Sequence, residues 1–201
     1  DVIHPARACA GIAIVKAHSP FRRAYDLADA LCRNAKGAIK KHTSGRDQSA
    51  LDWHFATTGI TAALGDLRGR SYQADDGCSL LMRPVALRTP GLEHPWRTWA
   101  NFSNTLDTLK NQQPWSGRRN KVIALREALR QGRDATKRFM RTYTIETLPK
   151  IDTAPPEMWQ NGFTNKHSAY FDPIEAIDLF LPLVPLDQLA ASQSQTVEVP
   201  A

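Results

Sequence analysis

Two lysines have the residue type and the spacing to bind phosphate. Lys36 and Lys40 are four residues apart in a segment with helical periodicity, so their side chains would lie on the same side of a helix. Two ammonium groups one turn apart could hold a triphosphate, because lysine acts toward phosphate as a compact point charge. The alternative is a solvated helix flank, where most lysines are found.

A second set of polar residues, Asp52 and His54, could form a catalytic pair. They alternate with Leu51, Trp53 and Phe55. In a strand this spacing puts the two polar side chains on one face and the three apolar ones on the other. We expect the polar face to be exposed to solvent, so an ordinary strand surface is the favoured interpretation.

The remaining candidates for catalysis or metal binding are weak. Asp75-Asp76-Gly77 is a pair of acids before a glycine, which is typical of a turn, and we predict a turn there and not a metal site. The sequence contains no Gly-x-Ser-x-Gly, P-loop, His-Glu-x-x-His or Rossmann glycine motif, and its six histidines are dispersed. We therefore assign no catalytic residue and no metal ligand.

Positive charge is concentrated in residues 118–141, where basic residues far outnumber acidic ones. Such a segment could contact the phosphates of RNA or DNA, or an acidic protein surface. It could equally be the solvated face of an amphipathic helix. Five of the basic residues repeat at spacings of three, four or seven and would form one stripe along a helix: Arg119, Arg126, Arg130, Arg133 and Lys137.

The composition narrows the class of protein. The chain has 201 residues, of which 42% are hydrophobic, enough for one core or one and a half. The 23% of charged residues exclude a chain that is disordered throughout, and the net charge of +6 permits an anionic partner. Three scattered cysteines, Cys9, Cys32 and Cys78, fit neither a disulfide framework nor a zinc site. We expect a reduced, cytoplasmic chain and, without an apolar run of about 18 residues, no membrane span.

Residues 1–60 predict a strand, a long helix and a second strand. Residues 8–16 form a nearly continuous apolar run, typical of a strand covered on both faces. Residues 20–42 carry an apolar stripe at helical spacing, and the alternating segment around Trp53 comes next. In the first strand Gly11 leaves room for the close approach of backbone or of a ligand. His18 precedes the helix, where it could approach a ligand or simply face solvent.

The rest of the chain predicts a small helical domain. Residues 61–90 form an irregular connector with a possible edge strand over 79–87, and the polar residues 191–201 form a disordered tail. The predicted fold class is therefore α+β. The domain itself spans residues 91–190, with predicted helices over 96–109, from near 116 to 139, and over 173–181 with Asp172 as its cap.

Three stretches of the sequence, residues 10–21, 24–36 and 49–55, resemble one known family in their sequence and in their order along the chain. They look like the second palm domain of the large, polymerase-like subunit of type III CRISPR effector complexes, and like its standalone bacterial homologues. That palm is related to the diguanylate-cyclase domain. Residues 80–85, 116–132 and 172–183 are similar to the segments on the C-terminal side of the palm in such proteins. The three stretches read Ala-Gly-Ile-Ala-Ile-Val-Lys-Ala-His-Ser-Pro-Phe over 10–21, Ala-Tyr-Asp-Leu-Ala-Asp-Ala-Leu-Cys-Arg-Asn-Ala-Lys over 24–36, and Ser-Ala-Leu-Asp-Trp-His-Phe over 49–55.

The resemblance implies the closing half of a ferredoxin-like palm (β-α-β) that binds ATP and makes cyclic oligonucleotide signals in anti-phage defence. Lys36, at the family's Ala-Lys position, and Lys40 would bind the nucleotide phosphates, with Gly11 and His18 nearby. Active members hold two Mg²⁺ ions with the carboxylates of a Gly-Gly-Asp-Asp hairpin before the first strand, because the two cations must bridge the attacking and leaving groups. This sequence has no such hairpin, so Mg²⁺ would need carboxylates from outside the chain.

Two functions therefore stay open. In the first, the sequence is the C-terminal part of a longer nucleotidyltransferase or cyclase whose hairpin precedes Asp1, and this chain alone is inactive. In the second, the chain is a non-catalytic palm-fold scaffold that binds RNA or another subunit of an effector complex. Residues upstream of Asp1 would distinguish the two, because only the enzyme needs the hairpin.

Overall fold

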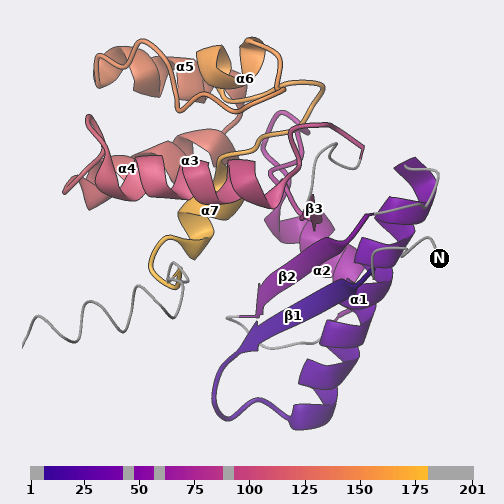
Figure 1. The fold of residues 1–201 in the computed structure, drawn as a ribbon. Helices are drawn as coiled ribbons and strands as arrows, with labels where there is room; N and C mark the ends of the chain where they lie inside the picture. The colour runs from indigo at the N-terminus through magenta and orange to yellow at the C-terminus, as the bar shows by residue number, and fades with distance from the viewer. Residues whose placement is uncertain (1–6, 43–47, 57–61, 88–92, 181–201) are drawn as a thin grey trace, which may run out of the picture.

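The protein has an α+β fold, described by a computed structural model over residues 7–42, 48–56, 62–87 and 93–180 (Figure 1). A three-stranded sheet has the order β1-β2-β3. The predicted tail, residues 191–201, lies outside the described residues. The helices and strands, in chain order, are β1 (Cys9–Val15), α1 (Phe21–His42), β2 (Ala50–Ala56), α2 (Leu64–Ser71), β3 (Val85–Ala86), α3 (Trp99–Asn111), α4 (Arg119–Arg130), α5 (Arg133–Thr142), α6 (Glu157–Asn161) and α7 (Phe171–Ala176).

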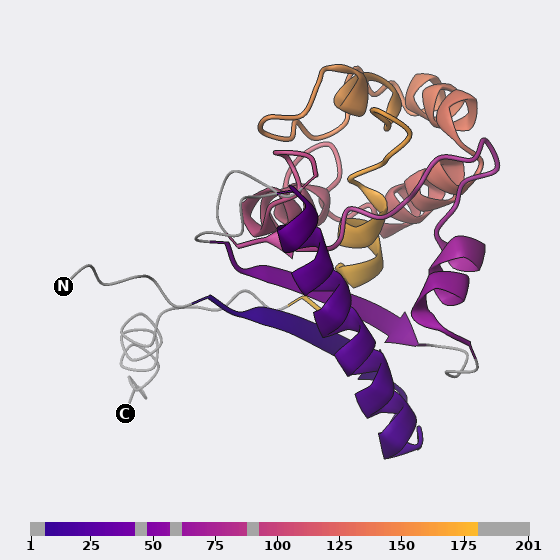
Figure 2. The ribbon, with the colours of Figure 1, turned by 90° about the vertical axis from the view of Figure 1, so that its right-hand side faces the viewer.

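The first unit is the predicted strand, helix and strand. β1 and β2 pair in parallel, with Cys9 opposite Ala50 and Val15 opposite Ala56, and α1 makes the crossover and lies along one face of the pair (Figure 2). The predicted apolar stripe faces the sheet, because α1 buries its side chains at helical spacing: Leu27, Leu31, Ala35 and Ile39.

β1 packs against α1 on one face and is only partly covered on the other by the described residues. Gly11 lies so close to α1 that an added Cβ would come well under 3.0 Å from the backbone of Ala28 and Cys32. On the opposite face Ile12 is 46% exposed, and β1 is an edge strand of the described sheet. Ile14 on that face packs against the main core, so the prediction of a strand covered on both faces holds for only part of β1.

The connector contributes less strand than predicted. Of residues 79–87 only Val85 and Ala86 form a strand, β3, which pairs antiparallel with Leu51 and Ala50 at the start of β2. The connector also contains α2, which the sequence did not predict because its eight residues include two glycines and lack a clear apolar stripe.

The predicted helix from near 116 to 139 is two helices. Gly132 lies between α4 and α5 with φ at 94°, a conformation that glycine adopts readily and other residues avoid. The carboxylate of Asp76 accepts a hydrogen bond from the backbone nitrogen of Arg133 and so holds the start of α5. The chain breaks here because of a contact that is distant in sequence.

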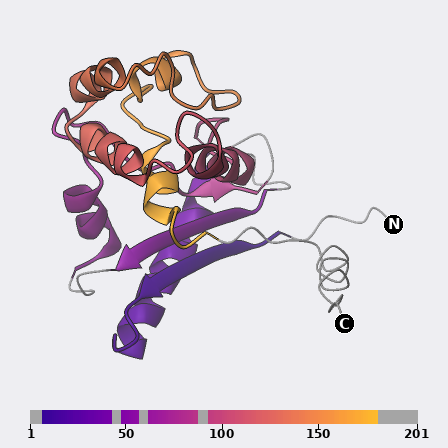
Figure 3. The same cartoon turned by 90° about the vertical axis from the view of Figure 1, so that its left-hand side faces the viewer.

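The two predicted parts share one hydrophobic core. Trp53 of β2 and Val85 of β3 belong to the same buried cluster as side chains of α3, α4 and α7, and α7 lies between the sheet and the other two helices (Figure 3). α7 begins at Phe171, so Asp172 is inside the helix and the prediction of Asp172 as its cap is wrong. No helix among the described residues is long and apolar enough to cross a membrane.

Candidate functional site

Lys36 and Lys40 lie as predicted on the exposed side of α1, one turn apart. The residues that precede them, Ala35 and Ile39, are buried against the sheet, so the lysine side chains lie away from the sheet face of the helix. The pair is therefore available to a ligand, on a convex helix surface.

Gly11 and His18 do not join the two lysines. The space beside Gly11 is filled by the backbone of α1, so this glycine serves packing and not the approach of a nucleotide. His18 is exposed in the turn before α1, while Lys36 is 15 residues beyond the first residue of that helix, a rise of about 22 Å. The four residues predicted near one nucleotide therefore do not converge.

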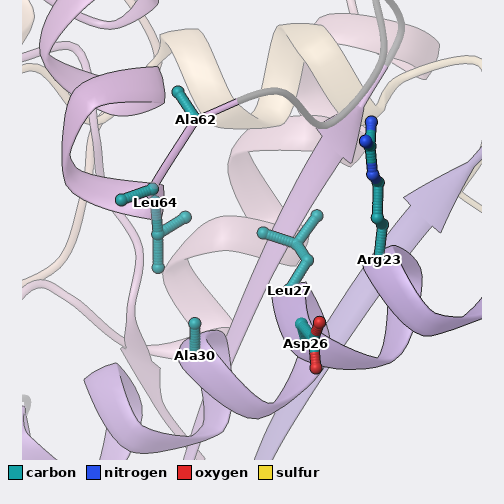
Figure 4. Close-up of a pocket in the computed structure, with 7 residues that line it drawn as sticks. Arg23, Asp26, Leu27, Ala30, Ala62 and Leu64 are labelled. Atoms are coloured by element: carbon teal, nitrogen blue, oxygen red, sulfur yellow. The ribbon is translucent and has the colours of Figure 1, made fainter.

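A hollow of about 650 Å³ lies between the first half of α1 and the start of α2 (Figure 4). Its wall is mainly apolar, with Leu27 and Leu64 facing each other across it. Arg23 and Asp26 are the charged residues that line it. Two opposite charges at its edge give no preference for an anionic ligand, and the predicted lysines do not line it.

Asp52 is fully buried, which corrects the prediction of an exposed polar face on β2. Its carboxylate accepts two hydrogen bonds from Arg68 of α2, at 2.7 and 3.0 Å. A third comes from Asn34 of α1 at 2.7 Å and a fourth from the backbone nitrogen of Trp53 at 2.9 Å. A carboxylate has about four acceptor sites, and these four hydrogen bonds use them. Asp52 therefore ties α1 and α2 to the sheet and is not available to act as a base or a metal ligand.

His54 is buried beside Asp52 and remains neutral at physiological pH. Burial, aided by the positive charges of Arg83 and Arg68 and opposed by Asp52, lowers the pKa of His54 to about 4. Its ring contacts the ring of Tyr72 edge to face, with 5.7 Å between centroids. A general base works best with a pKa near the working pH, so a catalytic Asp52–His54 pair is disfavoured, although not for the reason that the sequence suggested.

Acidification below pH 6.5 is expected to destabilise the protein. The unfolded chain protonates His54 below its usual pKa of about 6.5, whereas the folded chain does so only near 4. The unfolded state therefore binds more protons in this window. As the pH is lowered through it, the free energy of unfolding decreases by up to about 3 kcal/mol for this residue. Burial also lowers the pKa of His167, which acts in the same direction.

Urea denaturation at pH 7 and pH 5 measures this effect. His54→Phe, which keeps a ring beside Tyr72, should reduce the loss of stability between the two pH values. His18→Gln changes an exposed histidine and should leave the loss as it is. An unchanged loss in His54→Phe would contradict the assignment.

A second ionic cluster joins the connector to α7. The Arg83 side chain is fully buried, with its Nη2 3.0 Å from Glu175 and 3.4 Å from Asp172. The Tyr72 hydroxyl donates to Glu175 at 2.6 Å, and the Arg83 guanidinium lies 4.6 Å from the centre of the Tyr72 ring. Burial raises the pKa of Glu175, an effect that Arg83 opposes and Asp172 reinforces. These residues hold α7 against the rest of the fold.

The predicted basic stripe is divided, because α4 and α5 are separate helices. On α4, Arg119 pairs with Asp178, and the guanidinium groups of Arg126 and Arg130 lie 5.4 and 4.9 Å from the ring centre of Phe171. On α5, Lys137 is exposed and Arg133 is half-buried. The five residues therefore do not form one continuous surface for a nucleic acid.

The acidic turn at residues 75–77 does not belong to a cluster of potential metal ligands among the described residues. They contain no group of three or more histidine, cysteine or acidic side chains arranged around a metal position. The predicted turn at residues 75–77 is confirmed, with Gly77 at φ 78°. The Asp76 carboxylate is engaged by the backbone nitrogens of Cys78 and Arg133, and these bonds outweigh burial and lower the pKa of Asp76.

The buried acids with the best-defined geometry are thus structural, and the sequence missed their partners Arg68 and Arg83. Arg83 carried a usable signal, because it is the one charge within the otherwise apolar residues 80–87; such a charge indicates a buried pair.

A scan against protein-family models finds no match for this chain, and a search of the curated proteins finds no relative.

Proposed function

We propose that the chain is part of a nucleotide-binding palm related to the type III CRISPR large subunit, which makes cyclic oligonucleotide signals from ATP in anti-phage defence. The observation that carries the proposal is the element order β1, α1, β2, because these three elements coincide with the three stretches of sequence that resemble the family. In a split β-α-β ferredoxin-like domain a further strand lies between the two parallel strands, whereas β1 and β2 are direct neighbours. The proposal therefore rests on the sequence and order of the elements.

The free side of β1 supports a larger sheet. β1 has no strand partner on its outer edge among the described residues, and an unpaired edge accepts further strands readily. The sheet face opposite α1 borders an apolar groove of about 380 Å³, lined by Ile12, Ile14 and Phe55 among others. In this proposal further strands would pair with this outer edge and not between β1 and β2, which differs from a ferredoxin-like domain.

In this proposal Lys36 and Lys40 are the phosphate-binding residues that the chain contributes. Both are exposed on α1, and the flexible stem of a lysine lets it follow a triphosphate held by other parts of the palm. Gly11 contributes indirectly, because it lets β1 and α1 pack closely enough to fix the position of the helix. The carboxylates for Mg²⁺ come from outside this chain.

The test is oligonucleotide synthesis by the natural full-length protein that contains this chain. Incubation with ATP and Mg²⁺ should yield cyclic oligoadenylate, detected by mass spectrometry. Lys36→Ala should lower the rate about tenfold or more, because a charge-assisted hydrogen bond contributes about 1.5–3 kcal/mol. Lys41→Ala is the matched control, since Lys41 is exposed on the same helix but turned by about 100° from Lys40. Full activity in Lys36→Ala would exclude the phosphate-binding role.

The second candidate function is a non-catalytic scaffold for RNA or for another subunit. It is favoured by the buried carboxylates Asp52 and Asp172, which are used for structure, and by the excess of exposed positive charge on α5. The same preparation decides between the two functions. A scaffold makes no product from ATP and binds RNA with an affinity that falls steeply as salt rises, because phosphate contacts release counterions.

A further inference from the structure

A second hollow, of about 350 Å³, lies between the end of α3, the first turns of α4, and α7. It is far in sequence from Lys36 and Lys40, and its volume is within the range of small-molecule sites, about 300–1,000 Å³. Cationic and apolar side chains line it together. The cations are Lys110, Arg118, Arg119 and Arg126, and the acids are Glu175 and Asp178. The apolar residues are Leu109, Trp115, Val122, Ile123, Ile174 and Ile177, with Gly117 beside them.

The acidic residues of this pocket are engaged by partners from within the protein. Asp178 pairs with Arg119, and Glu175 is held by Arg83 and by the Tyr72 hydroxyl. The pocket is therefore not an electrically balanced surface. Four cations line it against two acids, so its lining carries an excess of positive charge.

Three cations in the pocket have no carboxylate partner in the described part of the chain: Lys110, Arg118 and Arg126. The Nε atom of Arg126 is buried and makes no hydrogen bond there. Close by, Lys121 lies with its Nζ 5.2 Å from the centre of the Trp115 ring, and burial together with the charge of Arg118 lowers the pKa of Lys121. Because Lys110, Arg118 and Arg126 line one pocket, their charges repel one another, and an anion would relieve the repulsion.

The apolar side chains of the pocket favour a ligand that has an apolar part as well as a negative charge. Ile123 is 41% exposed although it is a large aliphatic residue, and the partly exposed Ile177 lines the same pocket. A bare inorganic ion would leave this surface in water. A ligand with a flat apolar part would cover it and gain about 25 cal/mol for each Å² that it buries.

We propose that this pocket binds a phosphate monoester that carries a planar ring, of the size of a nucleoside monophosphate. The phosphate would lie among Lys110, Arg118 and Arg126, since arginine forms paired hydrogen bonds with phosphate oxygens. The ring would lie against Ile123 and Ile177. The site is separate from the lysine pair on α1 and does not depend on oligonucleotide synthesis.

Calorimetric titration of the full chain with AMP, inorganic phosphate and adenosine tests the proposal. AMP should bind at least tenfold more tightly than either of the two smaller probes, because only AMP has both parts. The NMR signal of the Trp115 indole should shift during the titration with AMP, since Trp115 lines the pocket.

Variants assign the binding to this pocket. Arg118→Ala and Ile123→Ser should each weaken AMP binding about tenfold, and the exposure of both residues makes unfolding an unexpected outcome that thermal denaturation checks. Arg138→Ala, which removes an exposed cation on α5, should leave the affinity unchanged. Equal affinities for AMP and phosphate would overturn the proposal, as would unchanged binding in Arg118→Ala or loss of binding in Arg138→Ala.

Discussion

Asp172→Ala is expected to lower the free energy of unfolding by about 3–5 kcal/mol, the range for breaking a buried ion pair by removing one partner. Asp172 Oδ2 accepts hydrogen bonds from the backbone nitrogens of Met82 and Arg83 at 2.8 and 2.9 Å, and Oδ1 lies 3.4 Å from the Arg83 guanidinium. The variant leaves two backbone donors unsatisfied and a fully buried arginine with Glu175 alone. Since domains are stable by about 5–15 kcal/mol, urea denaturation should show a large fall in the midpoint.

Two further variants separate the parts of this effect. Asp172→Asn keeps an oxygen that can accept from the two backbone nitrogens but removes the charge, so its loss of stability should be intermediate. Asp178→Ala removes an acid six residues further on whose pair with Arg119 is exposed, and it should cost no more than about 1 kcal/mol. If Asp172→Ala unfolds at the same urea concentration as Asp178→Ala, the cluster does not hold α7 in place.

The sequence predicted the elements whose pattern is local and repeated. The helix expected over residues 20–42 is observed as Phe21–His42, because its apolar residues recur at the helical spacing over six turns. The strands β1 and β2 were predicted to within a residue or two for the same reason. In such segments the pattern of burial repeats within a few residues, so no distant contact is needed to recognise it.

Elements that depend on distant contacts were missed. Gly132 was a single glycine within a periodic apolar pattern, and the break between α4 and α5 depends on Asp76, which is 57 residues away along the chain from Arg133. A sequence pattern carries no information on which distant side chain will satisfy the first backbone nitrogens of a helix. The prediction of one long helix was the natural consequence.

The polar face of β2 was misjudged for a related reason. Alternation shows that Asp52 and His54 share a face, but it does not show whether that face is covered. The face is buried because Arg68 of α2 supplies the charge that Asp52 needs, and a buried charge is tolerated only with such a partner. Sixteen residues separate the two, so the burial of Asp52 follows from the position of α2.

The candidate sites also divide into one that local spacing predicts and one that depends on distant contacts. Lys36 and Lys40 were predicted on one exposed side of a helix, which needs only helical spacing, and they lie there. The pocket with Lys110, Arg118 and Ile177 could not be predicted, because its residues come from three separate elements. Local spacing can indicate which side chains share a face, whereas a concave site requires the packing of the whole domain.

The second large effect is expected at Gly11, where alanine should destabilise the protein by about 3 kcal/mol or more, the upper part of the range for overpacking. The added Cβ would lie well under 3.0 Å from the carbonyl oxygen of Ala28 and from the backbone nitrogen of Cys32. Both atoms belong to the backbone of α1, which cannot rotate away as a flexible side chain could. β1 and α1 must therefore separate, and thermal or urea denaturation measures the loss.

Gly37→Ala is the matched control, because it makes the same chemical change in the same β-α-β unit with the opposite expected sign. An added Cβ at Gly37 meets nothing within 4 Å, and alanine is favoured over glycine by about 1 kcal/mol inside a helix, so this variant should be more stable than the natural chain. Opposite signs at the two glycines would show that close packing, and not the loss of glycine itself, determines the result. If Gly11→Ala is as stable as the natural chain, then β1 does not pack against α1 at that distance, and the β-α-β unit that carries the proposed function would need a different arrangement.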